Sequence, residues 1–358
     1  MASIKDVARR AGVSISTVSN VLNSTKRVSD ELTKSVNCAI SELNYEVDPV
    51  ARNMKMKQSK TIGVITVDMC GLYFPYLVKG IYELANYKKY GVIISDINCG
   101  DAQLTSVGRE LECFRRLIYN RVDGIIFAST VTRDILPEYI DEIERIAGRY
   151  KIIPLVSMGK DLTSFGLDSV YADNYEGGKK ATRHLLECGC RKIGHVTGPA
   201  RYGATLDRKQ GYYDALAESG LDFDENLIVN SDYTQRGGFL MMNKLLSQAP
   251  DIDGVFVGND QMAVGVLKAI TKNGRRIPQD IKLIGFDDVF VSSVLEPPIS
   301  SINVRKRFMG EQACRLLMDR LEGADSDKNP VGIEIETKLV VRKSTDISAS
   351  EDWILSEW

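Results

Sequence analysis

The stretch IKDVARRAGVSISTVSNVLN, residues 4–23, decides how the rest of the chain is interpreted. In its first half, apolar residues recur at the spacing of one helical face, at Val7, Ala8 and Ala11. Gly12 then marks a tight turn, and the hydroxyl of Ser14 is placed to accept a hydrogen bond from the free amides of a second helix, 15–22. The stretch therefore predicts two short helices joined by a turn.

The second predicted helix separates its apolar side chains from its polar ones. Its inner face would carry Val18, Val21 and Leu22. Its outer face would carry Ile15, Ser16, Thr17, Ser19 and Asn20. Hydroxyls and amides of this kind read base edges in a major groove, and a branched apolar group can meet a thymine methyl. The flanking basic residues favour a DNA reader over the alternative, a helical hairpin with no DNA role; they are Arg9, Arg10, Lys26 and Arg27.

A third helix is expected over residues 29–43, where apolar residues recur every three or four positions. Those residues are Leu32, Val36, Ala39, Ile40 and Leu43. They would pack across the two-helix unit and complete its core.

With RVS at 27–29 and AISELNY at 39–45, the stretch resembles the DNA-binding segment of the lactose-repressor (LacI/GalR) family of bacterial transcription regulators. The match covers some forty-five residues, with the turn glycine and both helices in place. The resemblance implies a helix-turn-helix domain over residues 1–48 that binds operator DNA. On the outer face and its flank, we expect Ile15, Ser16, Thr17, Asn20 and Arg27 to contact DNA.

Residues 45–60, YEVDPVARNMKMKQSK, form the second informative segment. Asp48 followed by Pro49 is a good helix start, but the two turns behind it are marginal as an isolated helix. The family resemblance implies a hinge segment at 49–60 that enters the minor groove, with Ala51, Met54 and Lys55 at the contact positions. Met54 stands where leucine is usual. A plain flexible linker is the alternative.

From residue 61 the chain alternates apolar strands with helices, as TIGVITVD (61–68), GVIISDI (91–97) and VDGIIFAS (122–129) illustrate. Continuous apolar strands between helices are typical of a doubly wound parallel sheet whose faces are both covered. The alternation then starts again with SVYADNYEGGKKATRHLLECG. The fold class is therefore α/β, with two lobes that resemble periplasmic sugar-binding proteins and the repressor core, behind an all-α reader.

The resemblance covers about residues 3–344 and implies three crossings between lobes, near 160, 290 and 322. We expect an effector-binding and dimerisation core at 61–344. Its first lobe would comprise 61–160 and 291–322, and its second lobe 161–290 and 323–344. In this core Val304 and Arg305 stand where a proline or glutamine is common. The tail at 345–358 is too short for a tetramerising heptad helix, so we expect a homodimer.

Ligands of open α/β sheets bind beyond the carboxyl ends of the strands, so the residues that follow strands are the candidates. The candidates in the segments after strands are Tyr73, Phe74, Ser129, Tyr233, Asn259 and Asp287, together with Arg208 at the start of a predicted helix. The family resemblance implies effector contacts at Phe74, Arg208, Asn259 and Asp287. A guanidinium and a carboxylate beside aromatic rings favour a carbohydrate. The alternatives are structural: Asp287 and Asn259 could cap the segments that follow them, and Arg208 could pair with a surface acid.

Charge and composition bound the remaining possibilities. Residues 1–60 hold ten Lys and Arg against six Asp and Glu, whereas the remaining 298 hold 36 against 42, so phosphate binding should be confined to the basic head. Seven scattered cysteines favour reduced thiols in a cytoplasm, and neither a signal peptide nor a membrane span is predicted. We expect no cofactor and no metal.

The sequence predicts a sugar-controlled repressor that binds a palindromic operator as a dimer. Enzymatic readings find no support, because GxSxG, HExxH and GxGxxG are all absent and the GGKK at 177–180 lacks the rest of a phosphate loop. The rival hypothesis is a solute-binding receptor of sugar transport without DNA function. The basic reader and the lack of a signal peptide argue against it.

Overall fold

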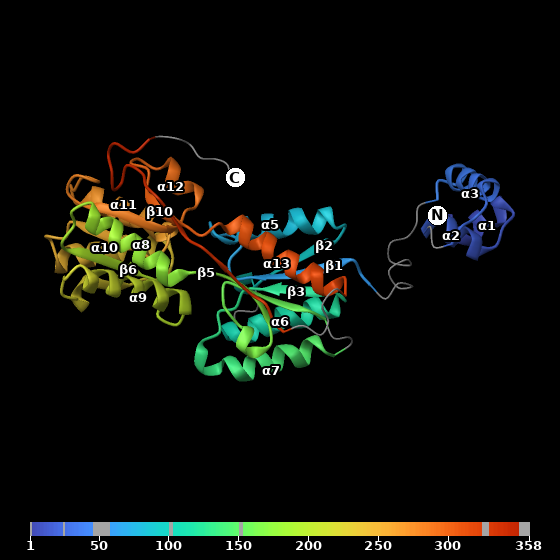
Figure 1. Ribbon diagram of the computed structural model, residues 1–358, viewed down its shortest axis with the longest axis horizontal. Helices are drawn as coiled ribbons and strands as arrows, with labels where there is room; N and C mark the ends of the chain where they lie inside the picture. Colours follow the sequence, from blue (N-terminus) through green and yellow to red (C-terminus); the bar gives the residue numbers. More distant parts are fainter. Residues whose placement is uncertain are drawn as a thin grey trace. The chain divides into compact units, whose positions relative to one another are not determined.

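The computed structural model describes residues 2–23, 26–45, 58–99, 103–149, 153–323 and 329–350. They divide into two compact units, one ending at Ser59 and the other beginning at Lys60 (Figure 1). The predicted hinge contacts Ala51, Met54 and Lys55 lie outside the described residues. Trp353 and Trp358, in the predicted tail at 345–358, also lie outside them.

The described residues of the small unit form three helices, α1 (Ile4–Ala11), α2 (Ile15–Asn23) and α3 (Asp30–Glu42). The predicted cap is present, because the amide of Thr17 donates to Ser14 Oγ at 3.1 Å. Gly12 adopts a left-handed conformation with a φ of 66°, which allows the sharp turn after α1. Ser3 and Asp6 also form a reciprocal capping box at the start of α1, a local signal that the sequence analysis did not use.

Five buried side chains form the core of this unit: Val7, Ala8, Val18, Val36 and Ala39. The inward position predicted for Leu32 is wrong, since 41% of this residue is exposed. Helix α3 meets α1 through its middle, where Ser35 Oγ donates to the carbonyl oxygen of Ala11 at 3.1 Å. The first turn of α3 extends past that contact, so an apolar residue at the correct spacing still faces outward.

The large unit contains two six-stranded sheets. The first has the order β11-β5-β4-β3-β1-β2, and its strands pair in parallel. Its strands are β1 (Thr61–Thr66), β2 (Gly91–Asp96), β3 (Gly124–Phe127), β4 (Leu155–Met158), β5 (Asp168–Ala172) and β11 (Gly332–Ile335). Helices α5 (Phe74–Tyr87) and α13 (Lys306–Leu321) cover one face, and α6 (Ser106–Tyr119) and α7 (Leu136–Ala147) cover the other.

The second sheet has the order β12-β10-β9-β8-β6-β7, parallel except where β10 meets β12. Its strands are β6 (Ile193–Thr197), β7 (Ile228–Asn230), β8 (Gly254–Val257), β9 (Lys282–Asp287), β10 (Ser300–Asn303) and β12 (Lys338–Val340). The helices of this lobe are α8 (Asn174–Glu187), α9 (Gly203–Glu218), α10 (Gln235–Gln248), α11 (Asp260–Lys272) and α12 (Phe290–Val294). Four 3-10 turns complete the described part of the unit, η1 (Ile97–Cys99), η2 (Arg133–Ile135), η3 (Thr163–Phe165) and η4 (Glu225–Leu227).

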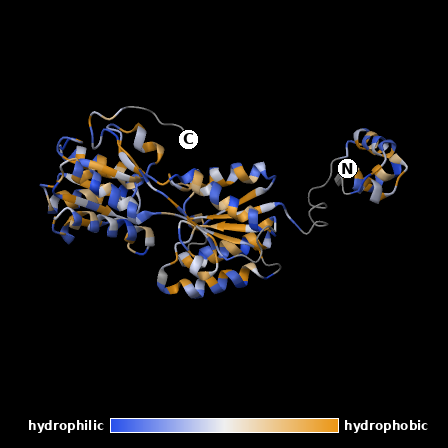
Figure 2. Ribbon diagram, viewed as in Figure 1, coloured by the Kyte–Doolittle hydropathy of each residue, from blue (hydrophilic) through white to orange (hydrophobic). Residues whose placement is uncertain are grey.

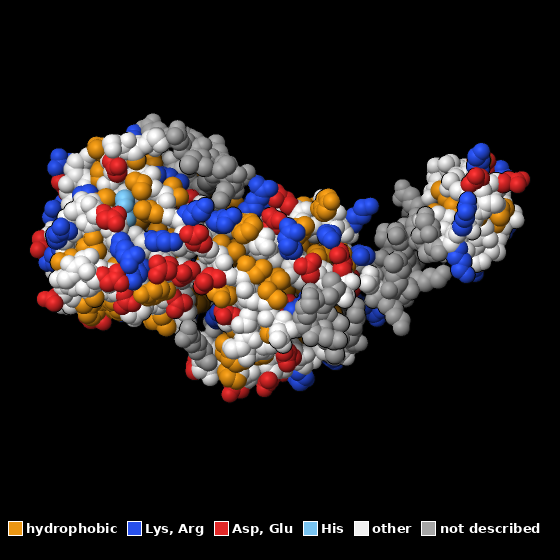
Figure 3. All heavy atoms as spheres, viewed as in Figure 1, with side chains coloured by type: hydrophobic (Ala, Val, Ile, Leu, Met, Phe, Trp, Pro, Cys, Tyr) orange, Lys and Arg blue, Asp and Glu red, His pale blue; other side chains and the backbone are white. Residues whose placement is uncertain are grey.

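Hydropathy explains this layering. In Figure 2 the strands of the first sheet are mostly in hydrophobic colours, whereas the helices around them mix hydrophilic and hydrophobic residues. One continuous apolar cluster includes residues of both lobes, among them Ile62, Met309 and Phe286. On the outer surface, Lys and Arg side chains are interspersed with Asp and Glu (Figure 3), as in the pairing of Lys179 with Glu218 on the second lobe.

The chain crosses between the lobes at positions that differ from the predicted ones. Strand β5 pairs with β4, β10 pairs with β9, and β11 pairs with β5. The crossings therefore follow Ala172, Asn303 and Ile335, rather than lying near 160, 290 and 322. The sequence of a buried strand shows that both of its faces are covered, but it does not show which sheet the strand joins.

Candidate functional site: a DNA-reading helix and an interlobe cavity

Helix α2 presents the side chains that the sequence analysis assigned to base contacts. Ile15 is 43% exposed and Ser16 is exposed beside it, whereas Thr17 and Asn20 are partly buried. Both hydroxyls in the first turn are already engaged with the cap, because Ser14 Oγ lies 2.7 Å from Ser16 Oγ and 2.9 Å from Thr17 Oγ1. Thr17 therefore stabilises the start of α2. Ile15 is the exposed apolar side chain of this helix that is available to contact a base.

Arg27, a predicted DNA contact, is exposed in the segment between α2 and α3. At the other end of the unit, Arg10 pairs with Glu42 at 2.6 Å. A basic side chain tied to a carboxylate is less available to phosphates than an unpaired one. Arg10 is therefore less available to phosphates than its sequence position alone indicates.

The large unit holds a cavity of about 420 Å³ between its two lobes. All seven residues predicted as effector contacts line it: Tyr73, Phe74, Ser129, Arg208, Tyr233, Asn259 and Asp287. The first three come from the lobe of β1, and the other four from the lobe of β6. The rule that ligand residues follow parallel strands therefore gathered a single constellation from distant parts of the chain.

Arg208 and Asp287 form the polar centre of the cavity. Arg208 is only 8% exposed, and its NH2 group lies 3.4 Å from Asp287 Oδ1. Its Nε donates to Asn174 Oδ1 at 2.8 Å, and its NH1 group donates to the carbonyl oxygen of Gly258. The guanidinium plane also lies 3.7 Å from the ring centroid of Phe286. These contacts fix a buried cation, so the alternative of a surface ion pair does not hold for Arg208.

The backbone around Asp287 is unusual. Asp287 and Asp288 both have positive φ values, 94° and 52°. Two consecutive non-glycine residues in this region are costly and persist only where surrounding contacts require them. Burial raises the pKa of Asp287, while Arg208 and Lys306 act in the opposite direction. The turn therefore brings a carboxylate to the cavity under backbone strain.

Aromatic rings form the walls of the cavity. On the first lobe, Tyr73 and Phe74 pack edge to face, with ring centroids 5.3 Å apart. On the second lobe, the ring centroids of Tyr202 and Tyr233 are 5.8 Å apart. The Tyr233 hydroxyl bonds to Thr205 Oγ1. Burial raises the pKa of Tyr233, so its hydroxyl stays protonated at neutral pH. A phenol whose hydroxyl is already bonded offers mainly its ring face to a ligand.

Two asparagines border the central pair. Asn259 caps α11, since the amide of Met262 donates to its Oδ1 at 2.8 Å. The structural role that the sequence allowed for Asn259, a helix cap, is therefore present. Its side-chain amide nitrogen is then the group left to face the cavity. Asn174, which the sequence analysis missed, accepts from Arg208 and begins α8. It also follows a strand, β5, and the same strand-end rule would have found it.

Ser129 lies on a loop that is bonded to two charged side chains, Glu110 and Lys160. The buried Glu110 carboxylate accepts from the amide of Thr130 at 3.2 Å and from the Tyr139 hydroxyl. Lys160 Nζ donates to the carbonyl oxygens of Ser129 and Val131. Burial raises the pKa of Glu110. The loop is therefore fixed before any ligand arrives, and sequence reasoning gave no sign of either charged group.

The two histidines have structural surroundings. His195 is fully buried between the rings of Tyr212 and Phe256, and burial lowers its pKa to about 4, so it is neutral. His184 Nε2 lies 2.7 Å from Thr345 Oγ1. Within the described ranges, no cluster of three or more His, Cys, Asp or Glu side chains is arranged to hold a metal. Among those same residues, no helix is long and apolar enough to cross a membrane.

A helix-turn-helix unit joined to a core with a preformed ligand cavity defines a ligand-controlled DNA-binding protein. The comparisons with known proteins agree. Residues 3–48 match the model of bacterial regulatory proteins of the lacI family, and residues 182–345 match a periplasmic binding protein-like domain.

The chain is 32% identical to the HTH-type transcriptional repressor PurR of Mannheimia succiniciproducens, over 96% of this chain and 98% of that protein. It is 33% identical to the ribose operon repressor of Haemophilus influenzae, with the same coverage. Among solved structures, the lac repressor dimer bound to operator and the anti-inducer ONPF matches with a TM-score of 0.84 and 26% identity, over 96% of this chain and 99% of that one. The complex of the transcriptional regulator CelR with cellobiose matches with a TM-score of 0.68 and 30% identity, over 96% and 100%.

The chain belongs to the LacI family of bacterial regulatory proteins. It is a DNA-binding transcriptional repressor under the control of a small molecule, and not an enzyme. The family resemblance and the fold class predicted from the sequence are both confirmed.

Proposed function

We propose that this repressor binds a sugar in the interlobe cavity and that the bound sugar alters its affinity for an operator made of two inverted half-sites. The seven cavity residues named above are the proposed sugar contacts. Ile15, Ser16, Thr17, Asn20 and Arg27 are the proposed DNA contacts on the reader, joined by Ala51, Met54 and Lys55 on the hinge segment. Acting on DNA, the protein would work in the cytoplasm.

The observation that carries this proposal is the pairing of Arg208 with Asp287 between aromatic walls. A guanidinium and a carboxylate at one place can donate to and accept from adjacent hydroxyls of a sugar ring. Aromatic faces can stack on the apolar face of the same ring. Acidic and basic side chains balance around the cavity, at three of each among the described residues, Asp68, Asp232 and Asp287 against Lys160, Arg201 and Arg208. A balanced lining favours a neutral polyhydroxy ligand over a charged one.

A homodimer follows from the way such readers work. One reader covers one half-site, and a twofold-symmetric pair requires two half-sites in inverted repeat. The lac repressor that this chain resembles binds its operator as a dimer, which supports the same assembly here. The dimer interface would then hold the two readers at a fixed spacing.

A thermal-shift experiment on the full chain tests the ligand class. Ribose, cellobiose and ONPG are each added to the wild type, to Arg208→Met and to the control Arg183→Met. Arg183 is a matched control because it is a surface arginine of the same lobe, paired with Glu218. A sugar at about 100 times its Kd stabilises the folded state by about 2.7 kcal/mol, which is several degrees of melting temperature.

We expect at least one sugar to raise the melting temperature of the wild type and the control, but not that of Arg208→Met. An equal rise in all three proteins would place the sugar elsewhere. In vitro selection of random DNA duplexes with the full chain tests the second half of the proposal. The recovered sites should be inverted repeats, and recovery of single half-sites would contradict dimeric binding.

A further inference from the structure

Lys306 stands at a position that is unfavourable for a lysine. It is the first residue of α13 and is only 4% exposed. The amino end of a helix carries partial positive charge, so a cation there is destabilised. Taking its ammonium out of water destabilises the folded state further unless other groups compensate. A residue that breaks two local rules at once points to a role beyond packing.

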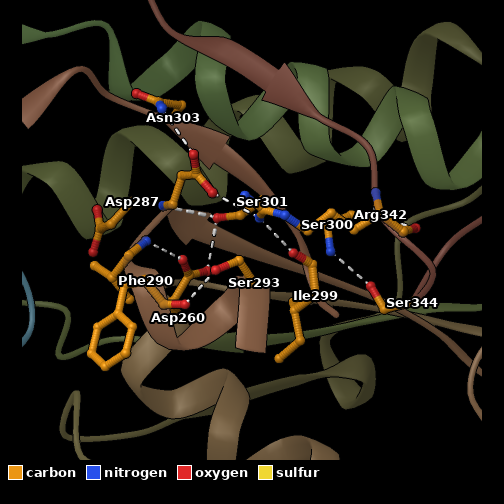
Figure 4. A network of polar contacts seen from close by, with 12 residues as sticks. Asp260, Asp287, Phe290, Ser293, Ile299, Ser300, Ser301, Asn303, Arg342 and Ser344 are labelled. Atoms are coloured by element: carbon orange, nitrogen blue, oxygen red, sulfur yellow. Dashed lines mark hydrogen bonds and ion pairs between the residues drawn. The ribbon is translucent and has the colours of Figure 1, made fainter. Parts of the chain in front are cut away.

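The compensation comes from the other lobe. Lys306 Nζ donates to the carbonyl oxygens of Asp287 and Asp288, the latter at 2.9 Å. These are the two residues with positive φ at the end of β9. In Figure 4 the same turn is tied into a wider network, in which Asn303 donates to the Asp288 carboxylate at 2.8 Å. The ammonium thus joins a helix of the first lobe to the strained turn that presents Asp287.

Helix α13 packs directly against α5. A Cβ atom on Gly80 of α5 would overlap the carbonyl oxygen of Arg307, and one on Gly310 of α13 would overlap the carbonyl oxygen of Leu77. The two helix backbones are therefore in direct contact where Leu77 and Gly80 face Arg307 and Gly310. Phe74, the first residue of α5, lines the cavity. The contacts therefore run from the Asp287 turn through Lys306, α13 and α5 to the first-lobe wall of the cavity.

We propose that Lys306 is a positioning residue that transmits effector binding from the Asp287 turn to the α13–α5 pair, and so sets how strongly the sugar changes operator affinity. Lys306 is not itself among the described residues that line the cavity. A sugar that engages Asp287 shifts the backbone of the turn, and the ammonium carries this shift across the lobe boundary. The inference rests on the proposed function and adds the route of its regulation.

The matched control is the next residue along α13. Arg307 is also basic and also lies in the first turn, but it is more exposed and pairs with Glu83 of α5, within its own lobe, at 2.7 Å. Removing its charge leaves the lobe boundary intact. Lys306→Met and Arg307→Met therefore remove equal charge from the same helical turn, and they differ in the interlobe contact. Lys306→Arg restores a donor to the two carbonyls.

The readout is the coupling ratio, the operator Kd with sugar divided by the operator Kd without it, or its inverse, whichever exceeds one. The probe is whichever of ribose, cellobiose and ONPG raises the wild-type melting temperature most, and the DNA is the selected inverted repeat. We expect Lys306→Met to bind both the sugar and the operator. Its coupling ratio should be at least fivefold lower than that of the wild type, or about one if the wild-type ratio is below five. Arg307→Met should keep the wild-type ratio, and Lys306→Arg should recover part of it.

Two results overturn the inference: a wild-type ratio in Lys306→Met, or an equal loss in Arg307→Met. A wild-type ratio of one would instead refute the proposed function, so the two failures are distinguishable. Should Lys306→Met not fold, hydrogen exchange on the wild type decides. The probe sugar should slow exchange of the Met309 amide, which bonds to the carbonyl oxygen of Arg305 at 2.9 Å and closes the first turn of α13. Unchanged exchange there would overturn the inference.

Discussion

The Arg208–Asp287 pair allows a prediction whose magnitude follows from the structure. Replacing Arg208 by methionine keeps an unbranched apolar side chain near the Phe286 ring, and it removes the ion pair, the hydrogen bonds and the cation–π contact of the guanidinium. Breaking one partner of a buried ion pair typically costs about 3 to 5 kcal/mol, because the other charge is left buried and uncompensated. The NH2–Oδ1 distance of 3.4 Å is long, which places the ionic loss at the lower end.

The bonds to Asn174 and Gly258 add about 1 kcal/mol each. Lys306 remains close to the Asp287 carboxylate and recovers part of the loss. We therefore expect Arg208→Met to lower the free energy of unfolding by about 3 to 4 kcal/mol. Operator binding without sugar should persist, because the reader is a separate compact unit.

The assay is denaturant unfolding of the wild type, Arg208→Met, Asp287→Asn and the double variant. Coupled neighbours show interaction energies of about 0.5 to 3 kcal/mol, so the double variant should be less destabilised than the sum of the single variants. Losses that add to within about 0.5 kcal/mol would show that the two side chains do not interact. The reasoning about the cavity centre would then be refuted.

Three further predictions concern separate parts of the chain. Ile15→Ala and Asn20→Ala should each change the preferred half-site by about 1 to 3 kcal/mol per lost base contact in competition binding, whereas uniform weakening across sequences would make them packing residues. Burial raises the pKa of Asp260 to about 7, so the folded state takes up a proton below that pH and loses stability as pH rises through it. Asp260→Asn cannot ionise, and its melting temperature relative to the wild type should therefore rise between about pH 6 and pH 8; a constant difference would contradict the buried charge. Gly80→Ala should separate α5 from α13 and cost about 1 to 3 kcal/mol in unfolding experiments, whereas Gly91→Ala, whose added Cβ would meet its nearest atom at 3.6 Å, should cost less.

The parts that could be predicted from sequence are governed by local rules. The reader is specified by helical spacing, a turn glycine and the Ser14 cap, all within twenty residues. Six of the seven cavity residues followed from one topological rule, that ligand groups stand beyond the carboxyl ends of parallel strands. Arg208 lies within α9, 79 positions from Asp287, and its prediction came from a helix start and from the family resemblance.

The parts that could not be predicted depend on long-range pairing. The lobe crossings were misplaced because β5 and β10 carry no sign of which sheet they join. Lys306 stands between two arginines in the sequence, and only the fold places its ammonium on the turn of the other lobe. The role of Glu110 could not be predicted either, because its hydrogen-bond partners come from a different helix and from a strand end.

The central claim is that the cavity controls the reader, and one reciprocal titration tests it most directly. Operator affinity is measured with and without the probe sugar, and sugar affinity is measured with and without operator. Because the two sites share one coupling free energy, both ratios should be equal and different from one. Operator affinity that does not change at a saturating concentration of a sugar shown to bind the cavity would contradict the account.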